Sequence, residues 1–315
     1  MMTTIEKEGE SMQQQKSFAS EGSQGNLYLV PTPIGNLEDM TFRALKVLQS
    51  VDLILAEDTR HTQKLLNHFE IDKPQKSFHK YNTQERIPEI LSLLEKGKDL
   101  AQVSDAGMPV ISDPGSELVQ ACLKAGIRVI PLPGANAALT GLIASGLNSE
   151  AFTFIGFLAK KAKNRRQQLM TYQNTGETLM IYESPYRISQ TIETAIEVFG
   201  PDRPACVVRE LTKSYEEFNR GSLAELSAYY QENPVVKGEI CFYIEGNPHP
   251  KSAAEQLQAG IDHLPLKGQV EWWMEEEKLS SKEAIKKVAK NKGLKKQEVY
   301  QAYHEIGGEA PWFST

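Results

Sequence analysis

The sequence predicts an α/β protein made of two α/β domains and a small C-terminal helical module. Short apolar runs alternate with amphipathic segments of helical period from residue 26 onward, and the alternation restarts between residues 145 and 150. After residue 270 the chain has helical, lysine-rich segments without further strand-like runs. We expect domains at 26–147 and 148–247, a linker at 248–269, a basic helical tail at 270–315, and a disordered polar tail at 1–25.

The alternation in the first domain predicts a parallel sheet covered by helices on both faces. The expected strands are 27–30, 53–56, 100–103 and 128–130, and the expected helices lie near 42–48, 65–69, 87–94, 118–124 and 135–144. In the second domain we expect strands at 152–155, 178–182, 205–208 and 240–244, with helices near 165–172, 188–198 and 223–230. Residues 213–220 are expected to add an antiparallel strand.

Composition limits the class of protein. The 315-residue chain carries a net charge of −6 with 24% charged residues, which is ordinary for a globular domain protein. No apolar stretch is long enough to span a membrane, and the N-terminus lacks the apolar core of a signal peptide. The three cysteines lie singly in apolar runs and the six histidines are scattered. We therefore expect a cytoplasmic protein with no metal site and no membrane partner.

Three loops rich in glycine, proline and alanine follow predicted strands of the first domain, at 31–37, 104–115 and 131–138. Open α/β sheets bind ligands outside the carboxyl ends of their strands, so these loops predict a ligand cradle. In the loop 104–115 we expect the first half to contact the ligand, and Asp113 and Pro114 to lead into the next helix. Tight turns with helix caps are the alternative interpretation. No dinucleotide or P-loop glycine motif is present.

Charged side chains follow two of the strands. Glu57, Asp58, Arg60 and His61 lie within five residues directly after the strand 53–56, where substrate chemistry is expected. The segment 182–187 has a similar place after a strand of the second domain. A capped helix start is the alternative in both cases.

Two segments are strongly basic. Residues 160–166 contain five cations, and residues 278–296 contain eight lysines and one glutamate in a pattern similar to a helix-turn-helix unit. In that unit we expect Ser281 to cap the first helix and Gly293 to end it. Contacts with RNA phosphates are the favoured interpretation, while a solvated surface or a dimer or docking module is the alternative.

These motifs, in this order, resemble the tetrapyrrole methylase superfamily, and in particular its branch of ribosomal RNA ribose methyltransferases. The resemblance covers residues 26–247 and is carried by the segments VPTPIGNL (30–37), AEDTR (56–60), SDAGMP (104–109), LPGANA (132–137) and YESPYR (182–187). The basic tail is also similar to that of this branch. The pigment-making members carry a G-x-G-P-G-D type of first loop, which this chain replaces with residues 31–36.

The resemblance implies an S-adenosylmethionine site between two α/β domains, a homodimer, and methylation of a cytidine ribose 2′-hydroxyl in the decoding region of 16S rRNA in the small ribosomal subunit. The cofactor contacts that it implies are Pro33, Ser104, Asp105, Ala106, Asn136, Ala137, Tyr182 and Glu183. The groups expected to accept the hydroxyl proton or to orient the substrate are Glu57, Asp58 and His61. The expected RNA contacts are Arg60, Lys160, Lys161, Lys163, Arg165, Arg166, Arg187, Lys286, Lys287 and Lys290.

Two other functions stay open at this point. One is a tetrapyrrole C-methyltransferase of the same superfamily, against which the two basic segments argue because a small substrate needs no remote cationic surface. The other is a non-catalytic RNA-binding factor for ribosome assembly that keeps the cofactor site as structure alone.

Overall fold

The computed structural model describes residues 2–7, 10–17, 23–234, 237–252, 255 and 261–304. The chain forms two compact units, Met1–Asn247 and Pro248–Thr315. The first unit contains two five-stranded sheets, and the second contains helices. In the described part of the chain, no helix is long and apolar enough to cross a membrane.

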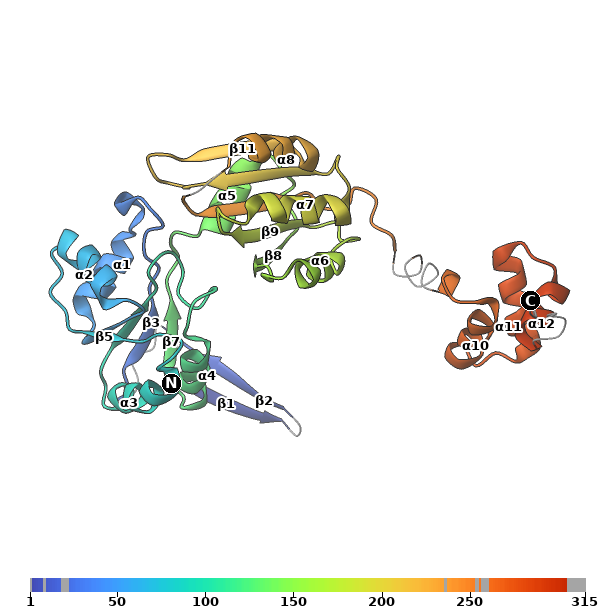
Figure 1. Cartoon of the computed structure of the whole chain (residues 1–315). Helices are drawn as coiled ribbons and strands as arrows, with labels where there is room; N and C mark the ends of the chain where they lie inside the picture. The colour runs from blue at the N-terminus through green and yellow to red at the C-terminus, as the bar shows by residue number, and fades with distance from the viewer. Residues whose placement is uncertain are drawn as a thin grey trace, which may run out of the picture. The chain divides into compact units, whose positions relative to one another are not determined.

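The first sheet is parallel throughout, as predicted (Figure 1). Its strand order is β5-β4-β6-β3-β7. The strands are β3 (Asn26–Leu29), β4 (Leu53–Ala56), β5 (Gln75–Ser77), β6 (Leu100–Val103) and β7 (Arg128–Pro131). The short polar strand β5 was not predicted, because Gln-Lys-Ser has no strand pattern of its own and pairs at the edge beside β4. The parallel order brings the carboxyl ends of β4, β6, β3 and β7 to one edge of the sheet.

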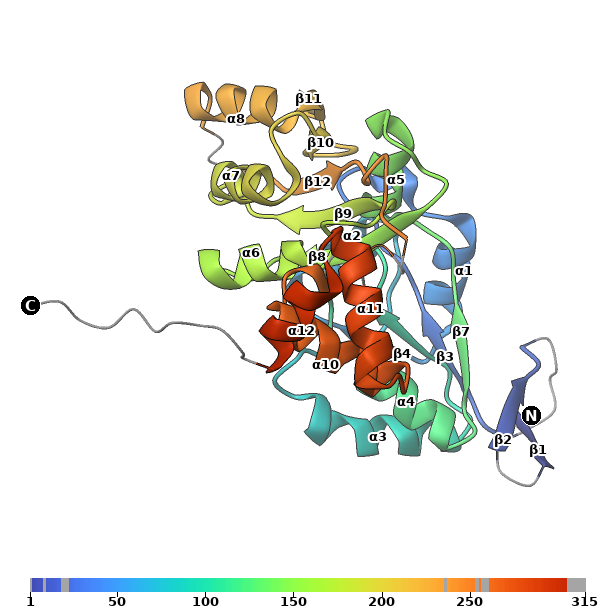
Figure 2. The ribbon, with the colours of Figure 1, turned by 90° about the vertical axis from the view of Figure 1, so that its right-hand side faces the viewer.

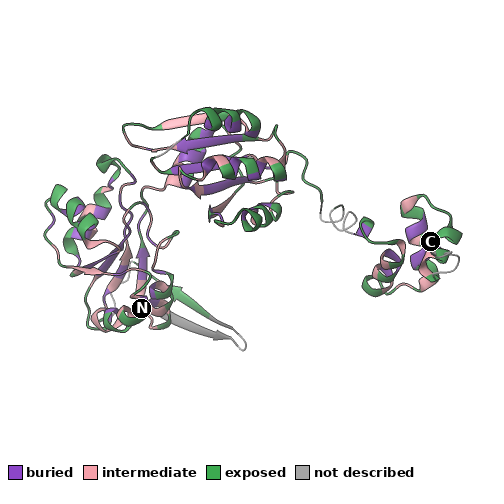
Figure 3. Ribbon diagram, viewed as in Figure 1, coloured by how far each residue is buried: buried purple, intermediate pink, exposed green. Residues whose placement is uncertain are grey.

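Helices cover both faces of this sheet (Figure 2). Side chains of α1 (Phe42–Ser50) and α2 (Thr59–His68) pack with Ile54 and Ala56 in one apolar core. Side chains of α3 (Thr83–Glu95) and α4 (Ser116–Lys124) pack with Leu55 in a second core. Successive residues of β4 therefore face opposite cores, which is why its run of four residues is entirely apolar. Figure 3 shows the buried strands between the half-exposed helices.

The N-terminal segment differs from the disordered tail that we expected at 1–25. Strands β1 (Met2–Lys7) and β2 (Glu10–Gln15) pair as an antiparallel hairpin. The Gln15 side-chain amide donates to the Val129 carbonyl at 3.0 Å and accepts from the Val129 N–H at 3.0 Å. Val129 lies on the edge strand β7, whose outward backbone groups need partners. Residues 8–9 and 18–22 lie outside the described part of this predicted tail.

The second sheet is mixed, with strand order β11-β10-β12-β9-β8. The strands β8 and β9 are parallel, and the other neighbours are antiparallel, including the expected additional strand, which is β11. The strands are β8 (Phe152–Phe157), β9 (Thr178–Glu183), β10 (Pro204–Arg209), β11 (Glu217–Ser222) and β12 (Ile240–Ile244). Side chains of α6 (Ala162–Met170), α7 (Ile188–Phe199) and α8 (Leu223–Glu232) share the core on one face.

Helix α5 (Ala137–Ser145) covers the other face of the second sheet. Its Ala138 and Leu142 pack in a core with Met180 and Tyr243, and the buried Tyr243 hydroxyl donates to the Ala137 and Ala138 carbonyls at 3.1 and 3.0 Å. We expected the first domain to include this helix and to end at residue 147. In the structure, α5 packs in the core of the second sheet.

The C-terminal unit packs three described helices, α10 (Leu266–Glu276), α11 (Ser281–Lys292) and α12 (Lys296–His304), around Val270, Trp273 and Val288. Ser280 caps α11 through a capping box with Glu283, one residue before the expected cap, and Gly293 ends the helix with a φ of 65° as predicted. Helix α10 begins within the expected linker. Residues 256–260 of that linker and 305–315 of the expected tail lie outside the described residues.

The packing of α5 on the sheet predicts that Gly141→Ala destabilises the protein. A Cβ atom at Gly141 would lie 2.2 Å from the Tyr243 hydroxyl oxygen, so we expect the free energy of unfolding to fall by about 1–3 kcal/mol. Urea denaturation measures this change. Because the hydroxyl oxygen is the nearest atom, the double variant Gly141→Ala/Tyr243→Phe should lose less than the sum of the single losses. Strictly additive losses would contradict the assigned contact.

Candidate cofactor site and charged strand ends

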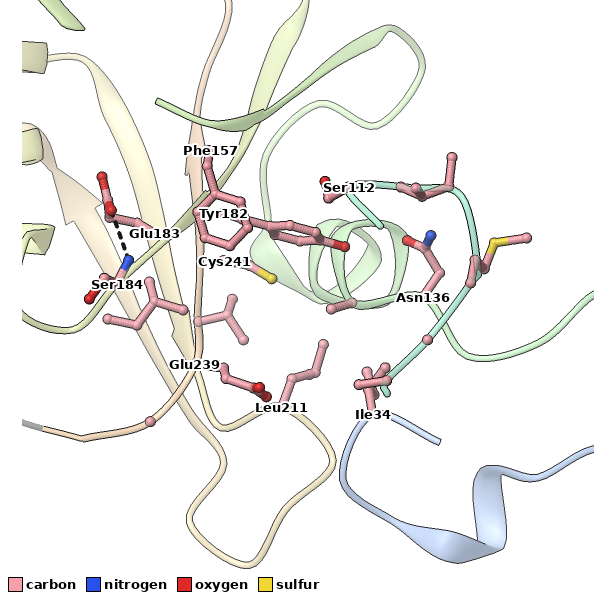
Figure 4. Close-up of a pocket in the computed structure, with 18 of the residues that line it drawn as sticks. Ile34, Ser112, Asn136, Phe157, Tyr182, Glu183, Ser184, Leu211, Glu239 and Cys241 are labelled. Atoms are coloured by element: carbon pink, nitrogen blue, oxygen red, sulfur yellow. Dashed lines mark hydrogen bonds between the residues drawn. The ribbon is translucent and has the colours of Figure 1, made fainter. Parts of the chain in front are cut away.

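A cavity of about 360 Å³ lies in the first unit, with walls from both sheets (Figure 4). Loops after β3, β6 and β7 form one wall, and the ends of β8, β9, β10 and β12 form the other. Among the lining residues are Ile34, Ala106, Gly107, Asp113, Asn136, Ala137, Phe157, Tyr182, Glu183 and Glu239. The cavity therefore lies where the carboxyl ends of parallel strands meet, as the three loops predicted.

Direct backbone bonds hold two of the predicted loops together. Thr32 and Gly107 exchange both backbone hydrogen bonds at 3.0 Å, and the Thr32 hydroxyl donates to the Ser104 carbonyl at 3.1 Å. The buried Ser104 hydroxyl donates to the carbonyls of Gly107 and Ala106 at 3.1 and 3.3 Å. These bonds fix Ala106 and Gly107 at the cavity wall, and they satisfy the polar groups that the tight turn buries.

The third loop ends at the start of α5. Asn136 is the N-cap of this helix, and its side-chain oxygen accepts from the Leu139 N–H at 2.9 Å. Asn136 and Ala137 both line the cavity, and Figure 4 shows Asn136 across it from Tyr182 and Glu183. Asn136 therefore both caps α5 and lines the cavity.

The structure brings together five of the eight residues that the resemblance implied as cofactor contacts. The cavity is lined by Ala106, Asn136, Ala137, Tyr182 and Glu183. Pro33, Ser104 and Asp105 lie outside its lining. Ser104 instead bonds the loop internally, and the Asp105 carboxylate accepts the Asp58 backbone N–H at 3.2 Å.

Three carboxyl groups lie near one another at the carboxyl ends of β4 and β6. Burial, together with the negative charges of Asp113 and Asp105, raises the pKa of Glu57 above its usual value. Burial raises the pKa of Asp113 to about 6, and the Asp105 carboxylate adds to that rise. Asp113 also lines the cavity, so our expectation that it would serve only as the entry to α4 is wrong. This role of Asp113 could not be predicted from the sequence, because its neighbours Ser112 and Pro114 are typical of a turn.

Asp58 and Arg60 have the capping role that was the alternative interpretation. Asp58 is the N-cap of α2 and accepts the Arg60 backbone N–H at 2.8 Å. The exposed Arg60 guanidinium also pairs with this carboxylate at 2.7 Å, and these bonds hold the pKa of Asp58 well below its usual range. Because both Asp58 oxygens already accept hydrogen bonds, Asp58 is a poor proton acceptor. His61 is exposed and lies outside the cavity lining.

Glu183 and Arg187 join the ends of β9 and β8. The buried Glu183 carboxylate accepts from the Ser184 N–H at 2.8 Å and from the Thr191 hydroxyl at 2.7 Å. Arg187 lies 3.4 Å from this carboxylate and donates to the carbonyls of Leu158 and Ala159, both at 3.1 Å. Arg187 therefore holds backbone at the cavity wall, in addition to any contact with RNA.

The basic segment 160–166 contains both exposed and buried cations. Lys160, Lys161 and Lys163 are exposed and form no ion pair with any described residue. Arg166 pairs with Glu197 at 3.3 Å. Arg165 is buried, with 3% of its surface exposed, and donates to the Thr194 hydroxyl at 3.0 Å and to the Gln190 carbonyl at 3.3 Å. The folded chain already uses this guanidinium, and its contact with RNA stays a prediction.

The lysines of the C-terminal unit also differ, since some are exposed and one is held by contacts within the unit. Lys287 lies 3.6 Å from the centre of the Trp273 ring and pairs with Glu277 at 2.5 Å, so the unit's own structure uses a residue that we expected to contact RNA. Lys282, Lys286 and Lys290 are exposed at four-residue spacing on one side of α11. They form no ion pair with the described residues. These three define a lysine stripe.

No group of histidine, cysteine and carboxylate side chains in the described residues could hold a metal ion. The thiols of Cys122, Cys206 and Cys241 are free and buried, and burial raises the pKa of each.

The sequence matches the model of the tetrapyrrole (corrin/porphyrin) methylases over residues 26–227. The chain belongs to this family. It is 46% identical to ribosomal RNA small subunit methyltransferase I of Halalkalibacterium halodurans over 294 residues, which is 93% of this chain and 100% of that protein. The Bacillus subtilis protein of the same name is 45% identical, covering 93% of this chain and 99% of its own length. The chain is thus of the ribosomal RNA small subunit methyltransferase I type.

Solved structures confirm the fold. Cobalt precorrin-4 methyltransferase covers 72% of this chain and 98% of its own, with a TM-score of 0.54 and 19% identity. Diphthine synthase covers 70% of this chain and 90% of its own, with a TM-score of 0.53 and 12% identity. At these identities the likeness establishes the two-sheet methylase architecture, and the expected tetrapyrrole methylase fold is confirmed.

The carboxyl cluster predicts that Asp113→Asn stabilises the protein at neutral pH. The pKa of Asp113 is about 6 in the folded chain, whereas the ordinary value for an aspartate is 3.8. Between these two pH values the folded chain therefore binds a proton that the unfolded chain has already lost. The contribution of Asp113 to stability therefore falls as the pH rises from about 4 to about 6 and stays low above that. We expect Asp113→Asn to raise the free energy of unfolding at pH 7 by about 1 kcal/mol and to change it little at pH 3.5.

Denaturation at both pH values measures this effect, with Asp39→Asn at an exposed carboxyl as the control. A lower stability of the Asp113 variant at pH 7 would show that the carboxylate makes favourable contacts there.

Proposed function

We propose that the chain transfers a methyl group from S-adenosylmethionine to the ribose 2′-hydroxyl of a cytidine in the decoding region of 16S rRNA. The observation that carries the proposal is the cavity at the carboxyl ends of β3, β6 and β7, in a chain that is 46% identical over 93% of its length to a small-subunit rRNA methyltransferase. The reaction would take place on the small ribosomal subunit in the cytoplasm, and the resemblance suggests that the enzyme is a homodimer.

The residues of the cavity fit S-adenosylmethionine. A volume of about 360 Å³ is in the range of small-molecule sites, and the wall combines apolar side chains with backbone groups at Ala106 and Gly107. The carboxylate of Asp113 at the cavity wall complements a cationic ligand. A related uroporphyrin-III C-methyltransferase, at a TM-score of 0.50, has been solved with S-adenosyl homocysteine. When bound, the cofactor supplies an activated methyl group.

This chain's own residues must then align the ribose oxygen and accept its proton. Glu57 and Asp113 are the carboxyl groups with a raised pKa near the cavity, so they are the acceptors that we propose. Asp58 would support this site by capping α2 and by its backbone bond to Asp105. His61, at the exposed start of the same helix, is left as a contact for the RNA.

The RNA would approach over the exposed cations. Lys160, Lys161 and Lys163 follow strand β8 at the cavity wall, and Arg60 extends from α2 into solvent. In the C-terminal unit we propose the lysine stripe of α11, which contains the predicted Lys286 and Lys290. Arg166 and Arg187 already make bonds within the protein, so their contacts with RNA would be additional to those bonds. A tetrapyrrole substrate would make no use of these surfaces.

Methyl transfer to small ribosomal subunits that lack the modification tests the proposal. With labelled S-adenosylmethionine we expect label at one cytidine ribose, mapped by nuclease digestion and mass spectrometry. Glu57→Gln and Asp113→Asn should each reduce kcat by about 100-fold or more if that group accepts the proton, and kcat should fall below pH 6 as Asp113 becomes protonated. Asp39→Asn, at an exposed carboxyl outside the cavity lining, is the control and should retain most of the rate.

Full rates in both the Glu57 and Asp113 variants would show that neither is the proton acceptor. Binding of cofactor and subunits without any label in the RNA would instead favour the assembly-factor function.

The lysine stripe predicts a salt-dependent contribution to RNA binding. We expect Lys282→Ala/Lys286→Ala/Lys290→Ala to weaken binding to the subunit and to reduce the slope of log affinity against log salt by about 2. Cofactor affinity should not change. The control, Lys46→Ala/Lys96→Ala/Lys124→Ala, removes the same charge from exposed positions of the first unit. Equal salt slopes in the stripe variant and the wild type would remove α11 from the RNA surface.

A further inference from the structure

Phe157 is an exposed aromatic side chain at the wall of the cavity. It is the last residue of β8, and 60% of its surface is exposed. Its ring lies 5.7 Å from the Tyr182 ring in an edge-to-face arrangement, and Tyr182 contacts Phe154 in the same way at 5.0 Å. Figure 4 shows Phe157 beside Tyr182 at the cavity. One edge of Phe157 is thus supported by packing while much of its surface faces solvent.

A β-bulge turns Phe157 toward the cavity. The register of β8 against β9 shifts between Phe154 and Gly156, so that Ile155 is an extra residue and Phe157 lies opposite Tyr182. Ile155 packs in the core under α6, α7 and α8, whereas Phe154 and Tyr182 pack on the other face. Without the bulge, strict alternation would place Phe157 on the face of Ile155.

The backbone around Phe157 is fixed on both sides. Gly156 has a φ of 73°, in the left-handed region that a side chain would disfavour. The next two carbonyls, of Leu158 and Ala159, accept hydrogen bonds from Arg187 at 3.1 Å. The exposed ring therefore lies on a fixed backbone.

Exposed cations follow Phe157 in the sequence. Lys160, Lys161 and Lys163 follow it within six residues and have no ion pair among the described residues. A planar apolar surface next to unpaired lysines matches a nucleotide, whose base stacks on the ring while its phosphates meet the cations. We propose that Phe157 is the stacking surface for the base of the RNA nucleotide that is methylated. This inference rests on the proposed function.

The target base fits this position better than the adenine of S-adenosylmethionine. A small ligand in an enclosed site has most of its surface covered by its protein contacts. Phe157 is more than half exposed, and the exposed lysines that follow it in the sequence lie outside the cavity lining. RNA arriving over those lysines meets Phe157 first. Because the ribose is joined to the base by one bond, a stacked base also positions the 2′-oxygen at the cavity.

Phe157→Leu tests the stacking surface in the full chain, because it keeps an apolar side chain and removes the ring. We expect the KM for small ribosomal subunits to rise about 10- to 100-fold. The dissociation constant of S-adenosylhomocysteine should stay at the wild-type value. Phe157→Tyr should restore the subunit KM. Phe152→Leu is the matched control, because Phe152 is 43% exposed on the same strand and lies outside the cavity lining.

A wild-type KM in Phe157→Leu would overturn the inference. An equal rise in the Phe152 control would overturn it as well, because the loss would then come from the strand. If Phe157→Leu weakens S-adenosylhomocysteine as much as the subunit, the ring stacks on the cofactor's adenine and the inference is wrong.

A second measurement separates this inference from the proposed function. We suggest photocrosslinking to small subunits assembled with 5-iodocytidine in their 16S rRNA, with the attached peptide mapped by mass spectrometry. A crosslink at Phe157 that is lost in Phe157→Leu supports the stacked base even if no methyl group is transferred, in which case the proposed function alone fails. Methyl transfer without a crosslink at Phe157 would overturn the stacking and leave the proposed function intact.

Discussion

The cavity depends on the pair of backbone hydrogen bonds between Thr32 and Gly107. These bonds join the loops that leave β3 and β6, two neighbouring strands whose loops would otherwise diverge into solvent. Two side-chain hydrogen bonds reinforce this connection: the Thr32 hydroxyl donates to the Ser104 carbonyl, and the Ser104 hydroxyl donates to the Gly107 carbonyl. Because every bond in this set ends on a backbone carbonyl or N–H, main-chain hydrogen bonds set the shape of the wall at Ala106 and Gly107. A wall of this kind keeps its shape while side chains elsewhere in the site vary.

The second wall is built on a different principle. Its side chains come from β8, β9 and β12, and their positions are set by Glu183, which accepts from Thr191 and lies beside Arg187. A buried carboxylate is stable here because it accepts two hydrogen bonds and has a nearby cation. The main-chain wall suits a ligand held by shape, and the side-chain wall suits discrimination between substrates.

Much of the first sheet could be predicted because strands buried on both faces are short, continuous apolar runs, as in residues 53–56 and 100–103. The position of α5 could not be predicted, since its small apolar residues suit either sheet and its contact with Tyr243 is seen only in the folded chain. The roles of charged residues were hardest. Arg165 and Lys163 are cations of the same basic segment and look equivalent in the sequence. In the structure Arg165 is buried and bonds to Thr194 and Gln190, whereas Lys163 is exposed.

The carboxyl cluster follows from the same geometry that makes the cavity. Parallel strands β4 and β6 end side by side, so Glu57 after one and Asp105 after the other are close by topology, and the turn at residues 110–113 returns Asp113 to them. Val110 and Ser112 take positive φ values of 76° and 63° in this turn, a conformation that costs free energy for a β-branched residue. The folded chain thus accepts both backbone strain and like-charge repulsion at the cavity. Such a cost is characteristic of residues positioned for chemistry, and it gives Asp113 a place in the site that capping of α4 does not require.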